Sequence, residues 1–574
     1  MRKQGIVYII LLIGLWSCRQ DVENVSSSPI SFAPELLQDY EKNEDIVLSS
    51  VTGFVKDENG EPLSEALVTL NNLATETDAF GHFFFNAILM NAEGTSVIVR
   101  KSNFHQISKS FHPQENVMEH LEIIMTTIKS NDDLPTGLGT QIQSLHENII
   151  VEFSDNSFLN NDSSPYTGIV HVESTLLSNN AAEFYQKSLG NLQAVDLQNE
   201  LVSLAPDALL YISYKDDAGN LLAINEDAET KLSIPVDYLS TGAMAWYYAP
   251  DYGLYTPNTE LQFSADGNDI LLNVKHNLPI IFAQSYASTR MTLKLFASNG
   301  EDVLENSPLS VISEDGKTLY VTRSNSEGVA TIVLPNEKSA TLQVKNACNE
   351  VVYNEAASSI NPMLNLAQIE LATVTGDLYD CEVMPNSNAV LSITQGGQQQ
   401  YYYPANENFS LRLQTCNNGL ANMQGLESTS GDASTTSAFD LKQDSALGDI
   451  FTCTSPSINE LRIENMDSGE MLVYPIEELD GNTVNLTAFG NTSLDIGISF
   501  NGSSTGDYSA ADLHSILRIW DDENGFRYAG DATTFSVERF GDDTIILGKF
   551  EGEFENTLTG EMDKIKGHFN FYRD

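Results

Sequence analysis

Apolar and polar residues alternate with a period of two along most of this chain, the pattern of β-strands that bury one face. In residues 51–70 the alternation is carried by Val51, Val55, Val68 and their polar neighbours. Residues 96–111 predict two further strands, and this region has no 3.6-residue helical period. The pattern therefore predicts an all-β fold.

Turn residues separate these predicted strands. The segment DENGEP, residues 57–62, contains Asn59-Gly60, a pair suited to the positive φ of a hairpin turn, and Pro62 closes it. The segment TDAFGHFFF, residues 77–85, has the same design, with Gly81 at the corner before an aromatic strand. Short strands joined by tight turns predict a β-sandwich.

Residues 49–128 resemble the carboxypeptidase regulatory-like (transthyretin-like) β-sandwich. The shared pattern is a strand, an NG-P-L turn, an A-V-x-L strand and a T-D-x-x-G-x-F strand. In that family the domain serves as a rigid spacer or support. The resemblance therefore implies a fold and says little about activity.

The same plan recurs further along the chain. Residues 296–335 contain a turn, a strand and the segment from Thr322 to Gly328 ahead of VATIVL, and a more degenerate version begins at Val374. Repetition predicts tandem Ig/transthyretin-like sandwiches, with chance similarity among β segments as the alternative for the third copy. A β-meander, which resembles the C-terminal module of Bacteroidota lipoproteins, is expected at the end. The predicted divisions are a signal peptide (1–17), a lipidated tether (18–48), the regulatory-like sandwich (49–128), a central β domain (129–287), a second regulatory-like or Ig-like sandwich (288–372), a third degenerate sandwich (373–460) and a C-terminal β module (461–574).

The amino terminus predicts export and lipidation. Arg2 and Lys3 precede the apolar run GIVYIILLIGLWS, which is shorter than the roughly 20 residues of a spanning helix. The run ends in LWSC, which resembles the lipobox of bacterial lipoproteins, so Cys18 is expected to carry the lipid; an ordinary secreted protein is the alternative. The following acidic segment resembles the export tether of Bacteroidota surface lipoproteins. We expect an outer-membrane lipoprotein on the cell surface, with the periplasmic face as the alternative.

Charge narrows the choice of partners. The chain has 574 residues, with 29 Lys and Arg against 80 Asp and Glu, and a formal net charge of −51. Such a charge repels phosphate backbones, so nucleic acid is excluded as a partner. The expected partners are the membrane, through the lipid anchor, and a glycan or a protein.

Four cysteines remain after Cys18. Because the chain is predicted to be exported, an even number is compatible with two disulfides, for which three connectivities are possible. Free thiols in neighbouring β domains are the alternative. The candidates are Cys348, Cys381, Cys416 and Cys453.

Motifs of enzymes are scarce in this sequence. The tetrapeptide HPQE, His112 to Glu115, has the H-x-x-E spacing of zinc peptidases that carry regulatory-like domains. No α/β catalytic domain surrounds it, so solvated loop residues are the preferred interpretation, and a zinc peptidase would contain stoichiometric zinc. We expect no catalytic residue, metal or cofactor, and we expect His171 and His276 to be packed or surface histidines.

One aromatic segment is the candidate for ligand binding. Residues 245–255 read AWYYAPDYGLY, and their rings could stack on sugars or bind a partner. The alternative is that alternating members are core residues. The candidate rings are Trp246, Tyr248, Tyr252 and Tyr255.

Two classes of function follow. The preferred hypothesis is a non-enzymatic cell-envelope lipoprotein whose tandem β domains form a structural or binding stalk on the outer membrane. The alternative is a glycan-binding accessory of a polysaccharide-uptake system, and a zinc carboxypeptidase-like enzyme is the remote third possibility.

Overall fold

The structure is a computed structural model that describes residues 45–572 apart from short gaps, and for residues 454–550 it describes the backbone alone. The chain forms two compact units: unit 1 reaches Leu371 and includes the segment Gln414–Asn418, and unit 2 holds Ala372–Leu413 and the chain from Gly419 onward. The gaps are 161, 180–183, 226, 236–238, 241, 251, 259–260, 265–267, 337, 381–385, 387–388, 405, 417–418, 429–430, 435, 454–459, 466–470, 476–477, 480–483, 489–493, 501–505, 509–516, 522–525, 531–533, 541–544 and 557–559.

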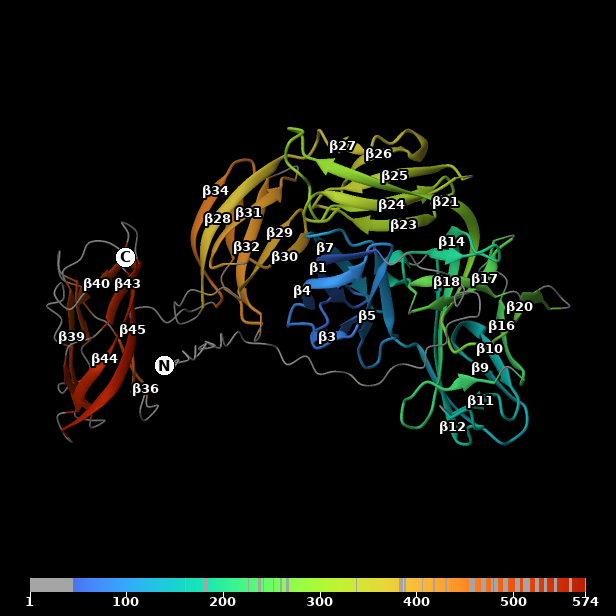
Figure 1. The fold of residues 1–574 in the computed structure, drawn as a ribbon, viewed down its shortest axis with the longest axis horizontal. Coiled ribbons are helices and arrows are strands. Elements are labelled where there is room, and N and C mark those ends of the chain that lie inside the picture. The colour runs from blue at the N-terminus through green and yellow to red at the C-terminus, as the bar shows by residue number, and fades with distance from the viewer. Residues whose placement is uncertain are drawn as a thin grey trace, which may run out of the picture. The chain divides into compact units, whose positions relative to one another are not determined.

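The first sandwich pairs a three-stranded sheet, β4-β1-β7, with a four-stranded sheet, β3-β2-β5-β6 (Figure 1). Strand β1 is antiparallel to β4 and parallel to β7. Its alternate residues Val51 and Val55 are fully buried, as the period of two predicts. The bounds are β1 (Ile46–Lys56), β2 (Leu67–Leu70), β3 (Leu73–Glu76), β4 (His82–Asn91), β5 (Thr95–Arg100), β6 (Ile107–Phe111) and β7 (Met118–Ile124).

Two further sandwiches have the same strand order. The second joins β24-β21-β27 to β23-β22-β25-β26, and the third joins β31-β28-β34 to β30-β29-β32-β33. In every sandwich the first strand is paired in parallel with the last. The all-β class with tandem sandwiches is therefore confirmed, while the domain boundaries given above stay a prediction. The bounds are β21 (Ile280–Phe296), β22 (Pro308–Ser313), β23 (Thr318–Arg323), β24 (Val329–Pro335), β25 (Ala340–Lys345), β26 (Val351–Ala356), the 3-10 helix η3 (Ala357–Ser359), β27 (Met363–Asn365), β28 (Leu371–Tyr379), β29 (Ala389–Gln395), β30 (Gln398–Tyr402), β31 (Asn408–Gln414), β32 (Leu420–Glu427), β33 (Ser437–Asp440) and β34 (Ser445–Phe451).

A close approach of an aromatic ring to a glycine also recurs. A Cβ on Gly53 of β1 would lie 2.6 Å from the ring of Phe83, and a Cβ on Gly376 of β28 would lie 2.8 Å from the ring of Phe409. Real atoms do not approach so closely, so each phenylalanine occupies the space that a side chain on the glycine would need. The equivalence supports a common plan for the first and third sandwiches.

Six tight loops of the described chain share one capping device. In each loop an Asp or Asn side-chain oxygen accepts the backbone N–H groups of the second and fourth residues after it. The third residue after it is Gly or Asn with positive φ. The short pattern [DN]-x-x-[GN] therefore forms the turn between one strand and the next in these loops. The loops begin at Asp57, Asp78, Asp196, Asp216, Asn325 and Asn346.

The central module lies between the first two sandwiches in sequence. Strand β21 leaves it and continues into the second sandwich, and the β14–β21 pairing closes the path β21-β17-β18-β13-β14 into a ring. A second sheet has the order β19-β20-β16-β10-β9. The bounds are β8 (Ser130–Pro135), β9 (Gln141–Ser144), the 3-10 helix η1 (His146–Asn148), β10 (Ile150–Phe153), β11 (Phe158–Leu159), β12 (Ile169–Ser178), α2 (Phe184–Lys187), β13 (Gln193–Val195), β14 (Leu201–Lys215), β15 (Ala223–Ile224), β16 (Thr230–Pro235), β17 (Met244–Ala249), β18 (Leu254–Asn258), β19 (Leu261–Phe263) and β20 (Asp269–Asn273).

The end of unit 2 is an eleven-stranded sheet. Its longest strands, β44 and β45, pair antiparallel from Ile545↔Tyr572 to Asn556↔Glu561. An antiparallel β module was predicted here from the alternation. The bounds are β35 (Glu460–Asn465), β36 (Met471–Pro475), β37 (Glu478–Leu479), β38 (Val484–Ala488), β39 (Leu494–Phe500), β40 (Gly506–Tyr508), β41 (Leu517–Asp521), β42 (Phe526–Gly530), β43 (Thr534–Phe540), β44 (Ile545–Asn556) and β45 (Glu561–Tyr572).

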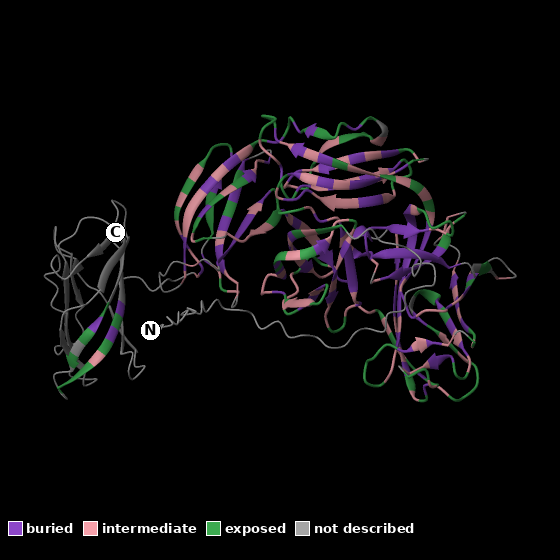
Figure 2. Ribbon diagram, viewed as in Figure 1, coloured by how far each residue is buried: buried purple, intermediate pink, exposed green. Residues whose placement is uncertain are grey.

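The first sandwich and the central module share one hydrophobic core. Val68 and Val99 of the sandwich belong to the same buried cluster as Tyr211, Trp246 and Tyr248 of the central sheet. Figure 2 shows the contrast between the alternating burial of the sandwich strands and the nearly continuous burial of the central strands. The central strands are covered on both faces, so unit 1 is a consolidated block.

Replacing Gly81 by alanine should destabilise the first sandwich strongly. Gly81 has φ of +73°, and its added Cβ would lie 2.3 Å from the carbonyl oxygen of Val55. We expect Gly81→Ala to lower the free energy of unfolding by about 2–4 kcal/mol. The control Gly60→Ala has φ of +85° but nothing within 4 Å of its Cβ, so it should cost about 1 kcal/mol. Equal losses in urea denaturation would contradict the steric argument.

Candidate functional site: the junction of three β modules

Lys109 of β6 is a buried lysine that crosses from the first sandwich to the central module. Its Nζ donates to the carbonyl oxygens of Tyr185 and Ser188, both at 2.6 Å, and lies 4.9 Å from the centre of the Tyr185 ring. Next to it, Gly190 donates its N–H to the carbonyl of Ser108 at 2.7 Å. The Gly190 bond pairs one backbone carbonyl of β6, which is an edge strand of its sheet.

The environment of Lys109 disfavours its positive charge. Burial lowers the pKa of its amine from 10.5 to about 7. The residues that receive its hydrogen bonds supply neutral carbonyl oxygens, so they satisfy the N–H groups without supplying a counter-charge. Lys109 is thus a specific interdomain link with an ionisable group at its centre.

His105 makes a second link between the same modules. Its ring stacks on Tyr211 with 4.9 Å between centroids, and its Nε2 lies 2.9 Å from Oγ1 of Thr175. Burial lowers the pKa of His105 to about 3. The ring is therefore neutral at physiological pH, and its packing supplements the shared core.

The first and second sandwiches meet along β7. The backbone of Met118 exchanges hydrogen bonds with Ser326, through its N–H to Oγ at 3.1 Å and through its carbonyl to the Ser326 N–H at 3.0 Å. Glu122 of β7 is ion-paired with Arg323 of β23 and, at 3.1 Å, with Lys56 of β1. The positive charge of Arg323 lowers the pKa of Glu122 to about 2. An ionised carboxylate therefore sits between two cations at this contact.

Glu119 lies one residue before His120 on the same strand and behaves differently from Glu122. Its carboxyl accepts the N–H of Gln114 at 3.1 Å and faces the amide of Asn325 at 3.5 Å. Burial raises the pKa of Glu119 to about 7. The contact thus contains one ionised carboxyl group and one whose charged form is disfavoured by burial.

A cavity of about 90 Å³ lies where the three modules meet. Strands β6 and β7, helix α2 and strands β22–β24 all contribute to its wall. Its ionisable lining residues include Lys109, His112, Glu119, His120, Glu122 and Arg323. This junction is the candidate functional site, and it serves to join modules, since Lys109 and Glu122 both bind the neighbouring module.

The predicted aromatic ligand site falls largely inside the core. Trp246 is 1% exposed, and Tyr248 and Tyr255 are fully buried. Trp246 Nε1 donates to the carbonyl of Ala283 at 3.2 Å, and the Tyr248 hydroxyl donates to Ser108 Oγ at 2.8 Å. These three rings occupy the core positions that the sequence left open as the alternative, and a ligand could reach them only after the modules separate. Tyr252 is partly buried beside a small cluster, and its role stays a prediction.

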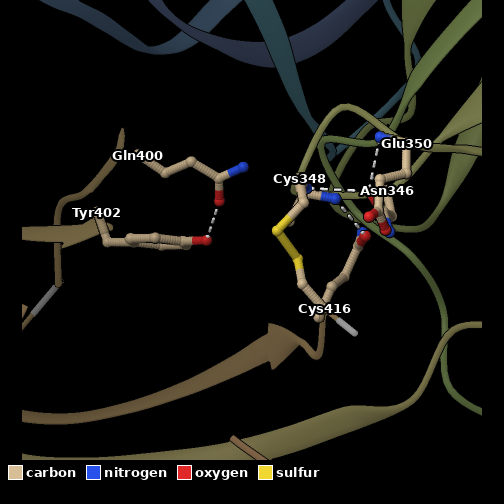
Figure 3. Close-up of a disulfide and its surroundings, with 8 residues drawn as sticks. Asn346, Cys348, Glu350, Gln400, Tyr402 and Cys416 are labelled. Carbon is tan, nitrogen blue, oxygen red and sulfur yellow. Dashed lines mark hydrogen bonds between the residues drawn. A yellow bond between two sulfur atoms is a disulfide. The ribbon is translucent and has the colours of Figure 1, made fainter. Parts of the chain in front are cut away.

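Cys348 and Cys416 form a disulfide (Figure 3). Cys348 lies in an Asx-capped loop, in which Asn346 Oδ1 accepts the N–H groups of Cys348 at 2.9 Å and Glu350 at 3.0 Å. Because Gln414 Oε1 also accepts the N–H of Ala347, at 3.0 Å, the segment Gln414–Asn418 is held to unit 1 both covalently and by hydrogen bonds.

The other three cysteines differ in what the structure describes. Cys453 is also disulfide-bonded, while Cys381 and Cys18 lie outside the described residues. The partner of Cys453 therefore stays a prediction, as does lipidation of Cys18.

The HPQE tetrapeptide does not converge on one point. His112 lines the cavity, whereas Glu115 is exposed and is not part of its wall. Within the described part of the chain, no three His, Cys, Asp or Glu side chains are placed to hold a metal ion. No described helix has the length and apolar character needed to cross a bilayer.

His171 is a surface histidine with two acidic neighbours. Its Nδ1 lies 2.6 Å from Asp133 and its Nε2 lies 3.3 Å from Asp217. The hydrogen bond to Asp133 raises the pKa of His171. Sequence analysis missed this bridge because strand pairing brings the three residues together.

Comparisons with known proteins give little further information. No protein-family model and no curated protein sequence matches this chain. The chain is similar to the shaft pilin SpaA of Lactobacillus rhamnosus GG at 13% identity, over 30% of this chain and 98% of the pilin, with a TM-score of 0.18. It is also similar to the TIE protein of Bacillus anthracis (12% identity, 54% and 47% of the two chains, TM-score 0.13) and to BcpA, the major pilin subunit of Bacillus cereus (9%, 71% and 99%, TM-score 0.13). Such low TM-scores carry no argument about function.

Sequence analysis did not single out the junction, although one signal was present. In ISKSF, residues 107–111, the period of two places Lys109 on the same face as Ile107 and Phe111. A lysine on an apolar face is a candidate for a buried link. The acceptors of the Lys109 hydrogen bonds are backbone carbonyl groups about 80 residues away. A pattern of side chains does not predict which distant carbonyl groups will accept them.

The burial of Lys109 predicts a specific pH dependence of stability. Its pKa is about 7 in the fold and about 10.5 in the unfolded chain, so the penalty for its charge is complete below pH 7 and disappears as pH rises to 10.5. Between pH 7 and 10, wild type should gain a few kcal/mol in free energy of unfolding relative to Lys109→Met. The exposed control Lys231→Met should show no such gain in urea titrations. Parallel curves for wild type and Lys109→Met would refute a lowered pKa.

Proposed function

We propose that this chain is a non-enzymatic cell-envelope lipoprotein that holds a consolidated β scaffold at the outer membrane. The scaffold function is supported above all by the junction: one hydrophobic core and several buried polar links join the modules of unit 1. Residues that might otherwise form a reactive site, such as Lys109 and Glu122, contact the neighbouring module.

The modules of unit 1 are held rigidly with respect to one another. Modules joined by flexible linkers sample many relative positions, and their mean end-to-end distance is short. Modules that share a core keep a fixed geometry. The continuous strand β21 serves the same purpose, because it is hydrogen-bonded to the central sheet in its first half and to the second sandwich in its second half. Unit 1 is therefore suited to present a surface to a protein or glycan partner.

The membrane part of the proposal rests on the amino-terminal sequence. A lipidated Cys18 would anchor the protein because each buried acyl CH₂ contributes about 0.8 kcal/mol. The 27 residues between Cys18 and Ile46 of β1 would then serve as the tether.

The anchor can be tested with the full-length chain in its own envelope. Cys18→Ala should abolish labelling by a radioactive fatty acid and lower the membrane-bound fraction at least about tenfold. Ser17→Ala is the matched control, because it keeps a small residue before the cysteine. Protease added to intact cells should degrade the body of the wild-type protein. Fatty-acid labelling that survives in Cys18→Ala would refute the anchor, and full protection from protease would refute display on the surface.

The glycan alternative can be tested separately. With Trp246, Tyr248 and Tyr255 buried, Tyr252 is the candidate ring with partial exposure. On a soluble glycan array we expect wild type and Tyr252→Ala to bind equally weakly. Clear binding that Tyr252→Ala reduces by about tenfold or more would favour the glycan-accessory function.

A further inference from the structure

His105 is held in one neutral tautomer at the contact between the first sandwich and the central module. Thr175 Oγ1 accepts the N–H of Lys129 at 3.0 Å and donates to the carbonyl of Ser174 at 2.8 Å or of Thr127 at 3.0 Å. Since the Thr175 hydrogen is used there, its oxygen accepts the Nε2–H of His105. A second proton would add a positive charge to a ring that is 6% exposed and stacked on Tyr211.

The charges around His105 have opposite effects on its protonation. Glu58 favours its protonation and Lys215 disfavours it, but both effects are smaller than that of burial. Glu58 is itself engaged by Lys129 at 3.2 Å and by Thr127. The carboxylate that favours a charged His105 is therefore already engaged by other partners.

His120 occupies the other contact of the first sandwich, on β7 beside the second sandwich. Its Nε2 is buried and has no hydrogen-bond partner among the described residues. Burial, together with the positive charge of Arg323, lowers the pKa of His120 to about 4. His120 in turn acts on His82 of β4, and burial, with a smaller contribution from His120, lowers the pKa of His82 to about 3.

Glu119 acts in the opposite direction at the same contact. Its pKa of about 7 means that acid removes a buried negative charge and strengthens docking. The cavity wall beside it also carries Lys109, His112, Glu122, Arg323, Tyr185 and Tyr320. Of these, Glu122 stays ionised to about pH 2 and Lys109 completes its protonation within about one pH unit below 7, so neither changes charge appreciably between pH 6 and 4.

We propose that the first sandwich is attached to the rest of unit 1 by an acid-sensitive joint, which weakens when His105 and His120 become protonated at its two contacts. This joint does not depend on the membrane anchor or on the identity of a partner. Its effect is to uncover the shared core, and with it the buried rings of Trp246 and Tyr248.

The direction and magnitude of the acid effect on docking follow from the difference in each group's pKa between the docked and the released state. Each histidine is neutral in the joint but titrates near pH 6.5 when released, so its contribution to docking is lost as pH falls from 6.5 towards 4. Glu119 restores part of the loss between pH 7 and 4.5. Relative to pH 7, docking should weaken roughly 30-fold at pH 4.5 and a few hundred-fold at pH 4.

Hydrogen exchange of the full chain measures this joint directly. After correction for the intrinsic rate, peptides covering β6, α2 and β17 should lose protection by about those factors between pH 7 and 4. Peptides of β22 and β25, inside the second sandwich, should keep theirs. Unchanged protection of β6, α2 and β17 across this range would overturn the proposal, as would an equal loss in β22 and β25.

Three variants assign the effect to residues. His120→Gln should remove nearly all of the net acid sensitivity, because the titration of Glu119 then offsets that of His105, and in the His105→Gln, His120→Gln double variant acid should strengthen docking. Glu119→Gln removes the opposing titration, so its loss of protection should begin at a higher pH than in wild type. Circular dichroism at pH 7 checks that each variant folds, and if His105→Gln does not, the two single variants at positions 119 and 120 still decide. A shift of Glu119→Gln to lower pH, or wild-type behaviour of the histidine variants, would overturn the proposal.

Discussion

The burial of one set of aromatic rings between the first sandwich and the central sheet is the contact on which unit 1 depends. Trp246 and Tyr248 are covered on one side by their own module and on the other by strands of the first sandwich. Each such ring contributes about 2–3 kcal/mol when it is fully removed from water. The polar links are arranged around this core, where exclusion of water makes each of them specific.

The same burial creates the electrostatic character of the junction. Burial disfavours the charged forms of Lys109, His105 and Glu119, whereas Glu122 stays charged because Arg323 and Lys56 lie beside it. A chain with a formal charge of −51 thus contains few charges at its central joint. Stability and pH are coupled here, since the groups that specify the docking are also groups that titrate.

Much of the fold follows from local patterns. The alternation around Val51 and Val55 predicts β1, and the loops at Asp57 and Asp78 follow from side chains that cap their own turns. Repetition of these patterns also predicted tandem sandwiches. The cavity and its lining were not predictable, because β6, β7, α2 and β23 come from three modules and no local pattern specifies how modules dock.

The sequence by itself determined the strands, the turns, the all-β class and an amino terminus typical of a lipoprotein, because these depend on neighbouring residues. Only the tertiary structure decided that Trp246, Tyr248 and Tyr255 are buried. The sequence of an aromatic strand is the same whether its outer face contacts solvent, a ligand or a second sheet. The tertiary structure likewise decided the role of Lys109, whose partners are backbone carbonyls of a distant segment. Docking is a property of surfaces, and surfaces exist only after the modules have folded.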